Sequence, residues 1–171
     1  MKKFLVALLP IALSAAATFG LENENSTVSW KNMVGVITAP GVDNPVGTIH
    51  GGAGPWSVHS GHARVNLLNG YTSFDVDGLV LNGSNASGTP GAITAVKGTL
   101  VCNSGGTAPM ILDTAAVSLN VHGDAHFDGQ ISGLPATCDN PVFLIRIVTP
   151  AGAAGRWIAT GASRFTEEDA R

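Results

Sequence analysis

The chain has 171 residues, of which 44% are hydrophobic and only 12% are charged, and its formal net charge is −3. This length fits one domain, and the composition excludes a chain that is disordered throughout. Glycine accounts for 22 residues, and because a glycine inside a helix costs roughly 1 kcal/mol relative to alanine, the composition favours short strands joined by tight turns.

Residues 1–20 have the layout of a secretory signal peptide. Two lysines precede an apolar run at 4–13, and small residues follow at 14–17. A membrane anchor is the alternative, but the run is shorter than the roughly 20 residues that span a bilayer. We expect cleavage near residues 17–20 and a mature protein that is secreted or periplasmic in a bacterial host.

The mature part is acidic, because removal of the two signal-peptide lysines leaves seven basic side chains against 12 acidic ones, a net charge of −5. A surface of that sign repels nucleic acid and anionic lipid. We therefore expect no nucleic-acid partner and no membrane insertion. The expected partner is an unknown extracellular or envelope component.

After a polar linker at 21–26, we expect one domain at 27–164 and a flexible tail at 165–171. Segments with strand character recur between Gly, Pro, Asn and Asp residues. In chain order the predicted strands are Thr27–Thr38, His62–Leu68, Tyr71–Leu81, Ile93–Cys102, Met110–Val121, Ala125–Ile131, Val142–Val148 and Arg156–Ala162. This spacing predicts an all-β fold, an antiparallel β-sandwich of about eight strands with immunoglobulin-like or similar topology.

The Asn-Gly pair at 69–70 predicts a hairpin with a two-residue type I′ turn. In that register Val65 lies opposite Phe74, and Arg64 lies opposite Asp75. Apolar and polar pairs then separate onto opposite faces of the hairpin, as a half-buried sheet requires.

A second hairpin is predicted around a three-residue turn at 122–124. That turn places Val121 opposite Ala125 and Leu119 opposite Phe127. A two-residue turn would mix apolar and polar faces, so the longer turn is preferred.

Cys102 and Cys138 are the only two cysteines. Export places them in an oxidising compartment, where thiols pair. The alternatives are two free buried cysteines or a metal pair, and the absence of a CxxC motif disfavours metal. We expect a disulfide that ties the predicted strand at 93–102 to the loop before the strand at 142–148.

The histidines are the best candidates for chemistry, since no nucleophile elbow, HExxH, Walker loop or GxGxxG occurs. His122, His126 and Asp128 have the alternate spacing that could line one strand face and bind zinc or copper. If residues 122–124 form a turn, however, only His126 and Asp128 share the strand. The alternative is a solvated polar sheet face.

The Gly-rich segment 49–56 contains His50 and Trp56 and precedes His62. These three residues could form a lip over a ligand, or the loop could be pinned by one buried tryptophan. A carbohydrate-binding platform is a further alternative, which requires Trp30 and Trp56 to be exposed on a shared face.

Two segments resemble the CHRD domain, a β-rich extracellular module found in chordin and in many bacterial secreted proteins. They are Ile49–Pro55 and Asn120–Asp124, the latter leading into Gly129–Ile131. More broadly, the runs at 96–102, 143–147 and 155–159 resemble uncharacterised small secreted bacterial proteins. These resemblances imply a β-rich extracellular protein and supply no catalytic residues.

We expect a secreted, non-enzymatic module for binding or envelope structure, without a cofactor. The alternative is a metal-dependent or hydrolytic secreted enzyme that uses His126 and Asp128 together with His122 or His62. In that case a metal ion would bind to this group of side chains.

Overall fold

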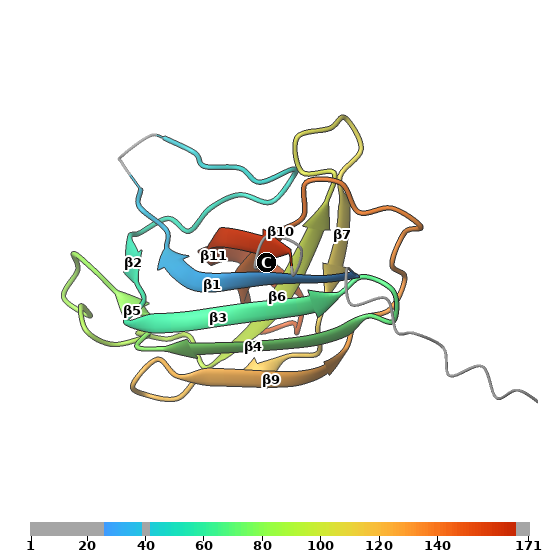
Figure 1. Ribbon diagram of the computed structural model, residues 1–171. Coiled ribbons are helices and arrows are strands. Elements are labelled where there is room, and N and C mark those ends of the chain that lie inside the picture. Colours follow the sequence, from blue (N-terminus) through green and yellow to red (C-terminus); the bar gives the residue numbers. More distant parts are fainter. Residues whose placement is uncertain (1–25, 39–41, 167–171) are drawn as a thin grey trace, which may run out of the picture.

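The computed structural model describes residues 26–38 and 42–166 (Figure 1). The predicted signal peptide lies outside the described residues, as do most of the predicted linker and tail. The described part of the chain is all-β, and it contains no helix that could cross a membrane.

Nine strands of the described residues form one antiparallel sheet in the order β7-β6-β10-β11-β1-β3-β4-β9, with β8 also paired to β6, while β2 and β5 form a separate small sheet. The bounds are β1 (Thr27–Gly35), β2 (Trp56–Ser57), β3 (Ser60–Asn66), β4 (Tyr71–Asp77), β5 (Val80–Leu81), β6 (Ala95–Cys102), β7 (Met110–Asp113), β8 (Val117–Ser118), β9 (Ala125–Gln130), β10 (Val142–Val148) and β11 (Ala154–Thr166).

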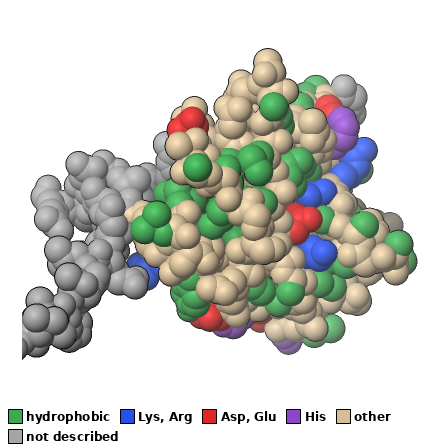
Figure 2. Space-filling view, turned by 90° about the vertical axis from the view of Figure 1, so that its right-hand side faces the viewer, with side chains coloured by type: hydrophobic (Ala, Val, Ile, Leu, Met, Phe, Trp, Pro, Cys, Tyr) green, Lys and Arg blue, Asp and Glu red, His purple; other side chains and the backbone are tan. Residues whose placement is uncertain are grey.

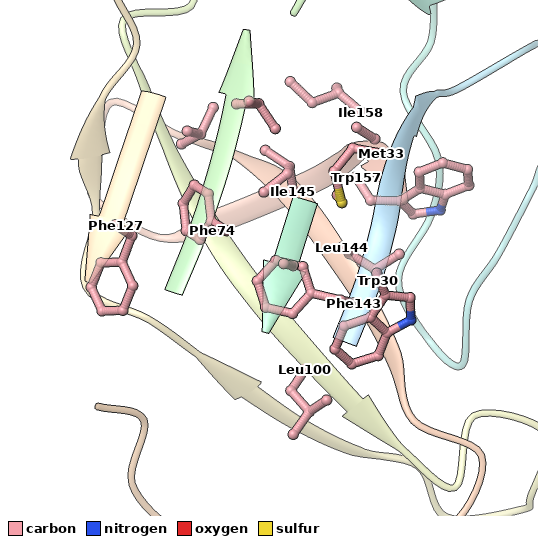
Figure 3. Packing of buried hydrophobic residues seen from close by; sticks show 14 of the residues in the cluster. Trp30, Met33, Phe74, Leu100, Phe127, Phe143, Leu144, Ile145, Trp157 and Ile158 are labelled. Carbon is pink, nitrogen blue, oxygen red and sulfur yellow. The ribbon is translucent and has the colours of Figure 1, made fainter. Parts of the chain in front are cut away.

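The large sheet curls, so that β3, β4 and β9 lie in front of β6 and β10 (Figure 1). Aromatic side chains fill the space between these layers (Figure 3). Phe74 from β4 lies between Phe143 from β10 and Phe127 from β9, with ring centroids 5.8 and 5.7 Å away, and Trp30 packs on Phe143 at 5.5 Å. The predicted all-β, sandwich-like fold is therefore confirmed.

Each predicted strand coincides with one or two observed strands. The segment predicted as Tyr71–Leu81 divides into β4 and β5 because Gly78 has a φ of +63°, which ends the extended strand. The segment predicted as Met110–Val121 divides into β7 and β8. β11 continues to Thr166, two residues into the segment predicted as tail.

The register of the first hairpin differs from the prediction by two residues. Ala63 pairs with Phe74, and Arg64 pairs with Ser73 rather than with Asp75. Because the shift is an even number, every side chain stays on its predicted face.

Asn66 causes this shift. Its side-chain Oδ1 accepts the backbone N–H groups of Leu68 and Asn69, and its carbonyl oxygen accepts the N–H of Gly70. The connection is therefore a longer turn that starts at Asn66, and not the two-residue turn that the Asn-Gly pair predicts.

The second turn begins one residue earlier than predicted. The backbone N–H of Gly123 donates to the carbonyl of Asn120, and the backbone N–H of Asn120 donates to the carbonyl of Asp124. Gly123 has a left-handed conformation with a φ of +86°. The loop residues are therefore 121–123. The predicted pairing of Leu119 with Phe127 is wrong, because β8 pairs with β6 and β9 pairs with β4.

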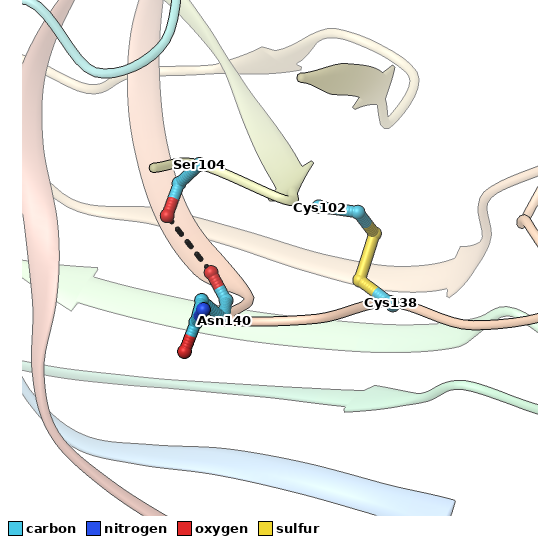
Figure 4. The surroundings of a disulfide bond; sticks show 4 residues. All are labelled: Cys102, Ser104, Cys138 and Asn140. Carbon is cyan, nitrogen blue, oxygen red and sulfur yellow. Dashed lines mark hydrogen bonds between the residues drawn. A yellow bond between two sulfur atoms is a disulfide. The ribbon is translucent and has the colours of Figure 1, made fainter. Parts of the chain in front are cut away.

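The predicted disulfide between Cys102 and Cys138 is confirmed, with Cα atoms 4.8 Å apart (Figure 4). It joins the end of β6 to the connection between β9 and β10. Beside it, the Ser104 hydroxyl donates to the carbonyl of Asn140 at 2.9 Å, so a hydrogen bond fastens the same two segments.

Candidate functional site

The polar face is the outward side of β3, β4 and β9. Residues alternate along these strands, so that apolar side chains enter the core while polar ones face solvent. The outward positions are Ser60, His62, Arg64 and Asn66 on β3, Tyr71, Ser73, Asp75 and Asp77 on β4, and His126, Asp128 and Gln130 on β9. In Figure 2, histidine and acidic side chains gather along the lower edge of the molecule, the edge that β9 forms in Figure 1.

The centre of the polar face is a row of three side chains in register. Asp75 pairs with His62 on β3 and with His126 on β9. Its Oδ2 lies 3.3 Å from His62 Nε2, and its Oδ1 lies 2.7 Å from His126 Nδ1. The three side chains are 38%, 58% and 63% exposed, so water screens this cluster.

Two further hydrogen bonds cross the polar face. The Ser60 hydroxyl donates to Asp77 Oδ2 at 2.8 Å. The Tyr71 hydroxyl donates to Asp128 Oδ2, and this bond raises the pKa of Tyr71 above its ordinary value.

The turn at 120–124 borders the polar face and is fastened to the end of β4. Asp124 accepts a hydrogen bond from the Asn120 side chain at 3.0 Å and another from the backbone N–H of Gly78 at 3.0 Å. The bond from Asn120, followed by that from Gly78, lowers the pKa of the Asp124 carboxyl. His122 lies in the same turn, and its electrostatic interaction with Asp124 also lowers the pKa of that carboxyl.

Two open depressions meet at Asp75 and Asp77. The first, of about 420 Å³, also includes Lys31, His59 and His62. The second, of about 230 Å³, lies on the other side of β4 and includes Ser118, Asp124 and His126. The ionisable side chains of four strands and two turns thus border one continuous surface.

The predicted metal ligands His122, His126 and Asp128 are not brought together. His126 contacts Asp75, Asp128 accepts from Tyr71, and His122 lies in the turn. Within residues 26–38 and 42–166, no three His, Cys, Asp or Glu side chains are placed to hold one metal ion. His62 and His126 approach different oxygens of Asp75, whereas metal donors must converge on one point.

The proposed ligand loop with His50, Trp56 and His62 does not assemble either. Backbone bonds fasten residues 50–52 to β11, since Gly52 donates to the carbonyl of Trp157 and Trp157 donates to that of His50. Trp56 is only 7% exposed, and His62 lies on the polar face. The segment is therefore a loop pinned by a buried tryptophan.

The aromatic platform for carbohydrate is also contradicted. Trp30 and Trp56 are both buried in the core, as is Trp157. None of them offers an exposed ring on which a sugar could stack.

A separate depression of about 320 Å³ lies beside His50, between Arg146 and Arg156. Arg146 is held there by the carbonyl groups of Gly155 and Ala154 and by Asp113, and His50 contacts Asp43. The His50 contact lowers the pKa of Asp43. Arg156 donates to the carbonyl of Gly51, so the charged groups of this depression are hydrogen-bonded as well.

No protein-family model, curated protein sequence or solved structure matches this chain. The resemblance to the CHRD domain therefore stays a prediction.

The sequence predicted Arg64 as the cross-strand partner of Asp75, and it indicated no partner for the hydroxyl group of Tyr71. Their partners on β9 lie more than 50 positions along the chain, and no local pattern predicts that β9 pairs with β4.

Proposed function

We propose that this chain is an exported, non-enzymatic binding module that contacts its partner through the polar face. One observation carries the proposal: the carboxylates and imidazoles of three strands gather on one open surface, where each of Asp75, Asp77 and Asp128 has a hydrogen-bond partner.

The exposure of this surface favours binding over catalysis. Enzymes gain most from charged groups in water-excluded sites, where electrostatic interactions are strong. His62, Asp75 and His126 are all more than a third exposed. Charges on an open surface steer association and determine which partner fits, and they need no enclosed pocket.

Export is part of this proposal. The disulfide between Cys102 and Cys138 supports it, because such bonds persist in oxidising compartments.

Affinity electrophoresis of the mature protein tests the proposal. Gels would contain dextran, dextran sulfate or glycol chitosan, so that neutral, acidic and basic polymers are compared, each at about pH 5.5 and about pH 7.5. We expect at least one polymer to retard the wild-type protein. The double variant His62→Gln/His126→Gln should change that affinity about tenfold, while His50→Gln, which lies off the polar face, should not.

Two results would contradict the proposed function. One is unchanged mobility in every polymer at both pH values. The other is one metal ion retained per chain after dialysis, measured by elemental analysis, together with hydrolytic turnover that is lost when the metal is removed.

A further inference from the structure

We propose that the polar face binds an acidic polysaccharide under mildly acidic conditions, and that histidine protonation controls this binding. The proposal rests on the proposed function and names its partner. It follows from the charges, the hydrogen-bond geometry and the shape of the face.

The charge of this surface changes sign with histidine protonation. It carries the four carboxylates Asp75, Asp77, Asp124 and Asp128 and the two cations Lys31 and Arg64, so its formal charge is −2 when histidine is neutral. Four of the five histidines, His59, His62, His122 and His126, border the same surface. When all four are protonated, the formal charge is +2. Histidine is the side chain that ordinarily changes charge between about pH 5 and 8.

The groups that face His62 come from three strands. Asp75 contacts it from β4, Lys31 lies across the first depression on β1, and Arg64 follows it on β3 itself. His59 and Asp77 border the same depression. One carboxylate therefore contacts this ring, and the cations Lys31 and Arg64 lie on the same surface.

The groups that face His126 are carboxylates. Asp75 contacts it from β4, Asp128 is the next outward residue on β9, and Asp124 lies beside it in the second depression. His122 stands next to Asp124 in the adjoining turn. Asp77 also borders that depression.

Protonation of His62 and His126 also changes which of their ring nitrogens can donate a hydrogen bond. His62 contacts Asp75 through Nε2, and His126 contacts Asp75 through Nδ1. The other nitrogen of each ring is an acceptor when the ring is neutral and becomes an N–H donor when the ring is charged. A carboxylate or sulfate group accepts a bond from such a donor but is repelled by the acceptor lone pair.

The remaining side chains suit a hydroxylated polymer better than a bilayer. Every outward position of β3, β4 and β9 carries a polar side chain, including Ser60, Ser73 and Gln130. These groups donate and accept hydrogen bonds, as sugar hydroxyls require. Binding to a bilayer surface uses several apolar side chains that enter the headgroup region, and among the outward positions of these strands only Tyr71 has a large exposed apolar part.

Binding to immobilised dextran sulfate tests this proposal, because its sulfate groups stay ionised at both pH values and any change reports on the protein. We expect affinity to rise at least about tenfold between about pH 7.5 and about pH 5.5, and to fall with added salt. The variant His62→Gln/His126→Gln should lose most of this rise, because glutamine is polar but gains no charge at the lower pH. His50→Gln, whose ring pairs with Asp43 away from the polar face, should keep it.

Four outcomes would overturn the proposal: equal affinity at the two pH values, a rise that persists in the double variant, equal binding to uncharged dextran, or binding to phosphatidylglycerol vesicles in place of dextran sulfate. A polymer other than dextran sulfate that binds through the polar face would leave the proposed function standing while this inference failed. If no polymer binds at either pH, both fail.

Discussion

Tyr71 offers a direct test of the polar face at the scale of one residue. It is the only tyrosine in the chain, so a titration of tyrosine absorbance follows a single group. Its hydroxyl donates to Asp128, and the neighbouring carboxylate disfavours the tyrosinate anion. We expect a titration midpoint above the ordinary value of about 10, measured from the ultraviolet absorbance of tyrosinate.

The matched control is Asp128→Asn, which keeps a hydrogen-bond acceptor but removes the negative charge. Its midpoint should fall toward the ordinary value for tyrosine. Coincident titration curves for the wild-type protein and this variant would show that Tyr71 and Asp128 are not paired in solution.

The individual side chains of the polar face were only partly predictable. The alternation of polar and apolar residues correctly places His62, Asp75, His126 and Asp128 on outward positions. The partner of each could not be predicted, because the contacts of Asp75 depend on the register of two strand pairs at once. The side chain of Asn66 determines one of these registers by forming bonds to the turn backbone.

At the scale of strands, β6 depends on a glycine in its interior. A Cβ atom at Gly98 would lie 2.7 Å from Phe143 Cζ and 2.8 Å from Phe74 Cε1. The absence of a side chain there lets both aromatic rings pack against the strand. We predict that Gly98→Ala lowers the free energy of unfolding by about 1–3 kcal/mol, the usual cost of overfilling a packed core.

Urea denaturation of Gly98→Ala and of the control Gly105→Ala tests this prediction. A Cβ atom at Gly105 meets nothing within 4 Å, so that variant should unfold within about 0.5 kcal/mol of the wild-type protein. Equal stability of the two variants would contradict the close packing of Phe74 and Phe143 on β6.

Strand positions were more predictable than strand pairing. A half-buried strand shows a period of two in its own sequence, as β4 does from Tyr71 to Asp77. Pairing is different, since β9 has β8 as its preceding strand but pairs with β4, far away in the chain. The predicted β8–β9 hairpin was wrong for this reason, although the turn between them is tight.

At the scale of the whole molecule, the connection between β9 and β10 links the two layers. β9 is the last strand at one edge of the sheet, whereas β10 lies between β6 and β11 in the other layer. The connection runs over residues 131–141 and is fastened to the end of β6 by the disulfide. The backbone N–H of Asn103 also donates to the carbonyl of Asp139.

Loss of the disulfide should therefore weaken the fold without abolishing it. The bond closes a loop with a sequence separation of 36 residues, and in the chain-entropy model its loss costs about 3–4 kcal/mol. We expect Cys102→Ser/Cys138→Ser to lower the free energy of unfolding by that amount in urea, while the circular dichroism of the folded protein stays that of a β-sheet. Thiol labelling of the unreduced, denatured wild-type chain should detect no free cysteine. Two labelled thiols per chain would contradict the bond itself, and a double variant as stable as the wild-type protein would contradict its role in holding the two layers together.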